Sequence, residues 1–110
     1  MTIALIIHNP INELEERSIS ISTESFFTDA WQPLAKVLNL QWIPLFQTGV
    51  FITNEDKDEI LDELILLINN LDLIQLTQME TDYFKTRSDL LIKEISEIFA
   101  LRDGITIYIG

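Results

Sequence analysis

Carboxylates are the side chains of this sequence best suited to chemistry. Six of them lie close together: Glu55, Asp56, Asp58, Glu59, Asp62 and Glu63. Carboxylates four positions apart share one face of a helix, and such pairs can hold a divalent cation or transfer protons. Asp56 and Asp58 are spaced as in a calcium-binding loop, but Leu61 stands where that loop needs glycine. We interpret the cluster first as a solvated helix start, second as an acidic surface that binds a partner, and last as a metal or catalytic site.

Other catalytic groups are scarce. His8 is the only histidine, so one chain cannot form a catalytic triad or a two-histidine metal site. We interpret it as a hydrogen-bonded structural residue, with a general base as the less favoured alternative. There is no cysteine, and the three glycines form no phosphate-binding loop. We therefore expect no catalytic residue, no cofactor and no metal, and we do not expect an enzyme.

The net charge narrows the choice of partner. The chain has 18 acidic and 7 basic residues, which gives a formal charge of −11. A small domain usually carries a charge of about 2 to 8 in magnitude. Nucleic acids and anionic membranes are bound through clustered Lys and Arg, so we expect neither as a partner. A basic protein would be attracted. The acidic residues concentrate at 13–16 and at 55–63.

The first part of the chain predicts two strands. Met1 to His8 is a continuous apolar run, which is typical of an interior strand buried on both faces rather than of a signal sequence. Asn12 to Arg17 is polar and predicts a solvated connection. Arg17 to Thr23 alternates strictly between Ser and Ile, which predicts a half-exposed strand paired with the first.

The next segment predicts a helix and then extended chain. Apolar residues recur at helical spacing after a start at Thr23 or Ser25. Pro33 predicts a kink or a second start near Asp29. The segment from Leu40 to Ile52 predicts a hairpin or one bent strand, with a turn at Thr48-Gly49. Four aromatic residues in this region are interpreted as core, with interface anchors as the alternative. They are Trp31, Trp42, Phe46 and Phe51.

Two more helices and a strand complete the pattern. Thr53 can cap an amphipathic helix that stops at Asn69-Asn70. Thr77 and Glu80 have the form of a capping box at the start of the last helix, for which we predict a break near Ser88-Asp89. Ile105 to Ile109 alternates as a final strand.

Strands mixed with amphipathic helices predict an α+β fold in two layers. We expect a small, mostly antiparallel sheet of three to five strands with about three helices packed on one face. The length suits a single domain over residues 1–110, and no linker or repeat divides it. The absence of cysteine and of a signal pattern favours a cytoplasmic location.

The general build also resembles a known class of proteins. Trp42-Ile43-Pro44-Leu45-Phe46 leads into an acidic helix after Thr53, and the chain ends in Ile105 to Gly110. In these respects and in its acidity the chain resembles the small acidic bacterial immunity proteins that neutralise partner toxins. The resemblance implies a non-catalytic protein that masks a basic protein partner, and it assigns no individual site residue. The alternatives are a structural or homo-oligomeric domain, such as a homodimer paired through strand edges, and then a small enzyme that uses carboxylates alone.

Overall fold

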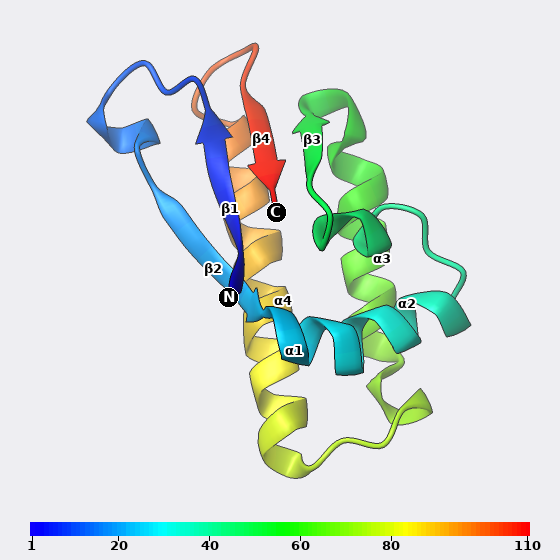
Figure 1. The fold of residues 1–110 in the computed structure, drawn as a ribbon. Helices are drawn as coiled ribbons and strands as arrows, with labels where there is room; N and C mark the ends of the chain where they lie inside the picture. The colour runs from blue at the N-terminus through cyan, green and yellow to red at the C-terminus, as the bar shows by residue number, and fades with distance from the viewer.

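Four antiparallel strands form one sheet in the computed structural model, which describes residues 1–110 (Figure 1). The strands are β1 (Thr2–His8), β2 (Ser18–Thr23), β3 (Val50–Thr53) and β4 (Thr106–Ile109). Their spatial order is β2-β1-β4-β3, so β1 and β4 are central. The pairing of β1 with β2 and the interior position of β1 are confirmed.

The helices lie behind and below the sheet as Figure 1 shows it. They are α1 (Glu24–Phe26), α2 (Gln32–Val37), α3 (Lys57–Asn69) and α4 (Gln78–Phe99). The capping box of Thr77 and Glu80 is present, and α3 ends at Asn69 with Asn70 as its C-cap, as predicted. The predicted break near Ser88-Asp89 is wrong, because α4 continues through it with Ser88 buried. None of the helices has a stretch that is long and apolar enough to cross a membrane.

Pro33 is accommodated by a widened turn. Between α1 and α2 the residues Phe27–Trp31 form a π-helical turn, in which the backbone N–H of Gln32 donates to the carbonyl of Phe27. Pro33 then falls in the first turn of α2, where a missing N–H costs little. The helix irregularity predicted near Asp29 is therefore present. It is a π-helical turn with one extra residue, and the helix continues after it.

The core fills the space between the sheet and the helices. Alternate residues of β1 and β4 point into it, including Leu5 and Ile107. Trp31 stacks on Phe84 with the ring centroids 4.6 Å apart. The prediction that β1 is buried on both faces is wrong, because Ile6 on the opposite face is 39% exposed. An apolar run has the same sequence pattern whether one or both faces are covered, and here helices cover only one.

The segment between α2 and β3 differs from the prediction. Only Val50–Thr53 is a strand, whereas Ile43–Phe46 forms a 3₁₀ helix. The hairpin or bent strand over Leu40 to Ile52 is therefore wrong. Pro44 lies in the first turn of the 3₁₀ helix, a position that its fixed φ favours. The turn at Thr48-Gly49 is confirmed, with Gly49 at a φ of +104°.

Candidate functional site

The acidic cluster lies where β3 leads into α3. The chain makes a short 3₁₀ turn over Asn54–Asp56 before α3 begins. Asp56 caps this turn, because its carboxylate accepts the backbone N–H of Thr53 at 3.0 Å while the Thr53 hydroxyl faces the same residue. One of the six predicted carboxylates therefore stabilises the start of the helix.

Two more of the six carboxylates hold a neighbouring segment in place. The Glu63 carboxylate accepts backbone N–H groups from Gln41, Trp42 and Ile43, with shortest distances of 3.2, 3.0 and 3.1 Å. Glu59, one helical turn earlier, accepts the Trp42 indole N–H at 3.0 Å. The three backbone donors precede and begin the 3₁₀ helix Ile43–Phe46, so Glu63 caps that helix from outside it, while Glu59 holds the Trp42 side chain beside it.

The remaining three carboxylates are free. Glu55, Asp58 and Asp62 are exposed and take part in no hydrogen bond or ion pair within the chain. We call these three residues the free acids. No group of three or more His, Asp or Glu side chains in the structure is arranged so that it could hold a metal ion. The free acids therefore face solvent.

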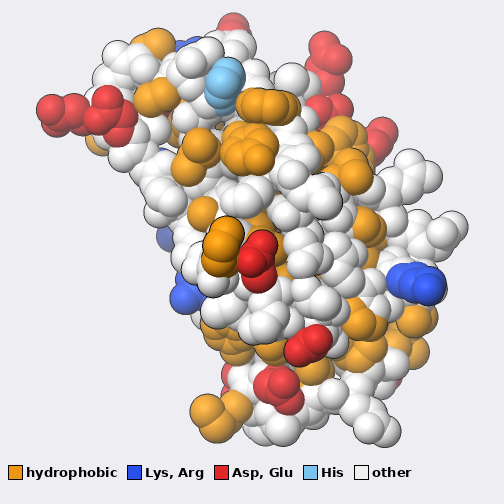
Figure 2. All heavy atoms as spheres, in the orientation of Figure 1, with side chains coloured by type: hydrophobic (Ala, Val, Ile, Leu, Met, Phe, Trp, Pro, Cys, Tyr) orange, Lys and Arg blue, Asp and Glu red, His pale blue; other side chains and the backbone are white.

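The sheet face opposite the helices is uncovered and carries aromatic side chains. Ile6 of β1, Tyr108 of β4 and Phe51 of β3 form one row across three strands, since Tyr108 is the register partner of both others. Phe51 contacts Tyr108 with centroids 4.9 Å apart, and His8 meets Phe51 edge-on at 5.1 Å and 76°. Figure 2 shows the single histidine beside hydrophobic side chains on this face. We call Ile6, His8, Phe51 and Tyr108 the open-face residues.

Sequence reasoning missed this face. Trp31 and Phe46 are core as interpreted, but Phe51 is 55% exposed, so its core interpretation is wrong. The available signal was the alternation Phe51-Ile52-Thr53, in which Ile52 is buried and its neighbours must point the other way. What the pattern could not show is that no helix covers that side.

Two glycines make room for Tyr108. A Cβ atom on Gly49 would overlap the Tyr108 hydroxyl, and a Cβ atom on Gly110 would lie 2.6 Å from the same oxygen. The tyrosine ring therefore lies across the backbone at these two positions. This packing fixes the orientation of the ring on the open face without any covering helix.

A polar hollow adjoins the aromatic row. Its volume is about 390 Å³, and Thr53 and Glu55 line it from one side while Asp103 and Thr106 line it from the other. Thr106 is the register partner of both Thr53 and His8, so the hollow lies next to the open face. Neither Glu55 nor the Asp103 side chain has a partner within the chain. Two carboxylates distant in sequence thus share one cavity.

The connection between β1 and β2 contains an ion pair in which the glutamate is buried and the arginine is partly exposed. Glu15 is only 3% exposed, and its carboxylate accepts two bonds from the Arg102 guanidinium at 2.8 and 2.9 Å. The hydrogen bond from Arg102 lowers the pKa of the Glu15 carboxyl, more than burial raises it. The prediction that residues 12–17 form a solvated connection is therefore wrong at Glu15. Its partner lies 87 positions away in sequence, so no local pattern reveals it.

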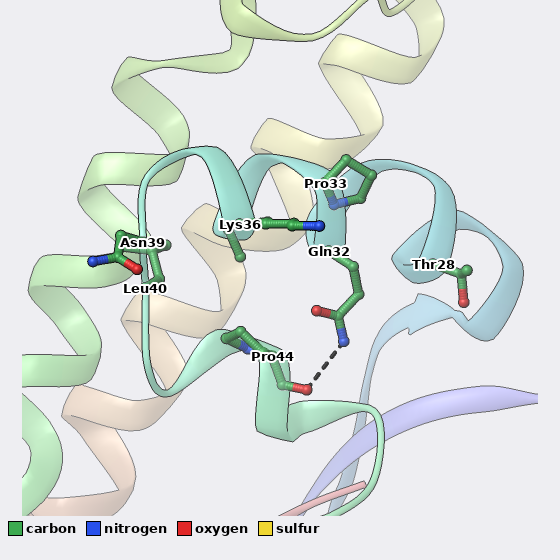
Figure 3. Close-up of a pocket in the computed structure, with 8 residues that line it drawn as sticks. Thr28, Gln32, Pro33, Lys36, Asn39, Leu40 and Pro44 are labelled. Carbon is green, nitrogen blue, oxygen red and sulfur yellow. Dashed lines mark hydrogen bonds between the residues drawn. The ribbon is translucent and has the colours of Figure 1, made fainter.

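The largest hollow of the molecule lies elsewhere, between α2 and the 3₁₀ helix (Figure 3). It has a volume of about 660 Å³, and Gln32 closes one side by donating to the Pro44 carbonyl at 3.0 Å. Lys36 is the one charged side chain that lines it, and Lys36 forms no ion pair. A single exposed lysine beside amide and hydroxyl groups does not form an acid–base pair.

Comparison with known proteins gave no match: no protein-family model, no curated protein sequence and no solved structure matches this chain. The functional inference therefore depends on the chain's own residues. Those are the free acids, the open-face residues and the hollow that Glu55 and Asp103 line.

Proposed function

We propose that this domain is a non-catalytic binding protein that masks a basic protein partner, and that the free acids are part of the binding surface. The observation that carries the proposal is the number of unpaired acidic groups. Only Glu15 and Glu94 among the 18 acidic residues form ion pairs, each with an arginine. The 3₁₀ turn Asn54–Asp56 and the first half of α3 together keep three carboxylates exposed and without a partner.

Unpaired acidic groups lower the stability of the free protein, because they repel one another. Asp58 and Asp62 are four positions apart in α3, where like charges destabilise a helix by about 0.2 to 0.5 kcal/mol per pair. A net charge of −11 adds repulsion over the whole molecule. A basic partner would relieve both, and long-range attraction would also speed its association. The resemblance to acidic immunity proteins points to the same role.

The one carboxyl group with a shifted pKa supports a binding function over a catalytic one. A strongly shifted pKa in a cleft marks a candidate catalytic residue. Here the carboxyl with a lowered pKa is Glu15, which is buried and locked to Arg102. His8 packs against Phe51 and has no carboxylate as a hydrogen-bond partner. A cytoplasmic location is part of the proposal, because a chain without cysteine needs no oxidising compartment.

The test compares two variants of equal charge. The free-acid variant carries Glu55→Gln, Asp58→Asn and Asp62→Asn. The control variant carries Asp72→Asn, Asp89→Asn and Glu97→Gln, three exposed acids elsewhere that have no hydrogen-bond partner. Each tagged protein serves as bait in an extract of its own cells, and the partner is eluted by raising the salt concentration and identified by mass spectrometry.

We expect the wild type and the control variant to retain the same basic protein and the free-acid variant to lose it. Binding of the purified partner, measured by calorimetry, should weaken steeply with salt. Equal loss in both variants would show that bulk charge, and not this surface, attracts the protein. Recovery of the chain alone, together with a dimer in light scattering, would favour the homo-oligomeric alternative and overturn the proposal.

A further inference from the structure

The uncovered sheet face is the most unusual surface of the molecule. A small sheet normally buries one face and presents polar side chains on the other. Here Ile6, Phe51 and Tyr108 form a continuous apolar row on the solvent side, although the strands are bordered by acidic segments. Contiguous apolar surface rimmed by polar residues is typical of a protein interaction site.

The charge around this face indicates what it binds. Figure 2 shows acidic side chains on both sides of the aromatic row, over the β1–β2 connection and near the start of α3. Glu13 and Glu16 are exposed in that connection, and Glu55 and Asp103 line the hollow at the other side. Arg102, the cation nearest to the hollow in sequence, is bound to Glu15. The face therefore has an apolar centre and an acidic border.

We propose that the open-face residues and the adjoining hollow form the docking surface for the basic partner, with an arginine side chain of that partner entering the hollow between Glu55 and Asp103. This inference rests on the proposed function and adds the place of contact and the recognised side chain. The arginine stem packs along Phe51, and the guanidinium meets the two carboxylates.

Arginine fits this surface better than lysine does. Its planar guanidinium offers five donors, so it can serve two carboxylates at once, and it also stacks on aromatic rings. Thr53 and Thr106 add hydroxyl acceptors to the same hollow. The aromatic row supplies the apolar contact that a strongly solvated ammonium group would not use.

A second copy of this chain is the less suitable occupant. In a two-fold dimer the same patch faces itself, so the acidic border of one copy would meet the acidic border of the other. Both copies carry a charge of −11, which opposes such contact. A basic protein removes this conflict, and charge complementarity therefore selects it.

The surface can be tested without knowing the partner. The probe is the peptide acetyl-Gly-Arg-Gly-amide, titrated into the ¹⁵N-labelled protein while amide chemical shifts are recorded. The matched probe replaces arginine by citrulline, which has the same shape and no charge. We expect the arginine peptide to cause saturable shifts at Phe51, Thr53, Glu55, Asp103 and Thr106, and the citrulline peptide to cause none.

Two variants separate the hollow from general acidity. In Glu55→Gln/Asp103→Asn the Kd of the arginine peptide should rise by about fivefold to tenfold, since both carboxylates that face the guanidinium lose their charge. In Asp72→Asn/Glu97→Gln, which has the same net charge and changes two exposed acids outside this surface, the Kd should change by less than about twofold. Shifts spread over all acidic segments, or equal effects of the two variants, would overturn the proposal.

The outcomes also separate this inference from the proposed function. If the partner is captured by a Phe51→Ser variant as well as by the wild type, the protein binds a basic partner through another surface and the inference fails alone. If the peptide binds at the hollow but no basic protein is captured, the proposed function fails, and only the arginine-binding role of the hollow is supported. If light scattering shows a dimer that Phe51→Ser dissociates, a second copy occupies the face and the proposed occupant is wrong.

Discussion

The carboxylate of Glu63 should be worth far more to stability than its acidic neighbours on the same helix. Its two oxygens accept N–H groups from Gln41, Trp42 and Ile43. Replacing Glu63 with Ala removes all three acceptors at once. Ile43 is fully buried, so water cannot replace the bond that its N–H loses.

The magnitude follows from these contacts. An unsatisfied buried donor costs about 1 to 3 kcal/mol, and loss of a helix cap costs about 0.5 to 2 kcal/mol. We expect Glu63→Ala to lower the free energy of unfolding by about 3 kcal/mol. Glu63→Gln keeps one acceptor oxygen, which can still serve Trp42 and Ile43, and should cost about 1 kcal/mol. The adjacent control Asp62→Ala, at an exposed residue without a partner, should change stability by less than about 0.5 kcal/mol.

Urea unfolding followed by circular dichroism measures these differences. For a slope of about 1.5 kcal/mol per molar urea, Glu63→Ala should move the midpoint down by roughly 2 M. Asp62→Ala should leave it nearly unchanged. Equal midpoints for the two alanine variants would refute the capping role of Glu63, and with it the division of the acidic cluster into structural and free carboxylates.

Three further predictions concern other contacts. Gly49→Ala should destabilise the protein by about 2 kcal/mol or more, because φ is +104° and the new Cβ overlaps the Tyr108 hydroxyl. Thermal melting measures this loss of stability. The loss should be smaller in a background that already carries Tyr108→Ala. The pKa of Glu15 is lowered by Arg102, so the ion pair stabilises the fold fully above the ordinary glutamate pKa and progressively less as the pH falls through the lowered value. Unfolding curves of wild type and Glu15→Gln should therefore converge in that acidic range, and a constant gap would contradict the assignment. Ser88→Ala should be neutral or stabilising by up to about 1 kcal/mol in urea unfolding, since the buried Ser88 hydroxyl has no hydrogen-bond partner; a clear loss of stability would indicate a bound water there.

The local parts of the fold were predictable because short segments determine them. Thr77 and Glu80 satisfy each other's backbone groups within a single turn, so the start of α4 can be identified without knowing the fold. The Ser and Ile alternation of β2 sets its two faces in the same way from Ser18 to Ile21, whereas Ser22 is also buried, at an irregularity in the register with β1. The α+β class follows from the order of such segments, and the sheet with helices on one side confirms it.

The candidate site was only partly predictable from local pattern. The sequence places the free acids at a helix start, and they are exposed there. It does not distinguish them from Glu63, another carboxylate of the same cluster, which caps a segment about 20 positions earlier in the chain. That difference depends on which loop packs against α3.

The sequence alone therefore determined the −11 charge, the single histidine, the absence of cysteine and the positions of the local caps at Thr53 and Thr77. Only the tertiary structure decided which carboxylates are used internally, which face of the sheet stays open, and that Asp103 joins Glu55 at one hollow. The physical reason is the separation along the sequence between the residues that interact. Local caps and strand alternation depend on residues a few positions apart, whereas burial, pairing and the cap supplied by Glu63 depend on segments that meet only when the chain is folded.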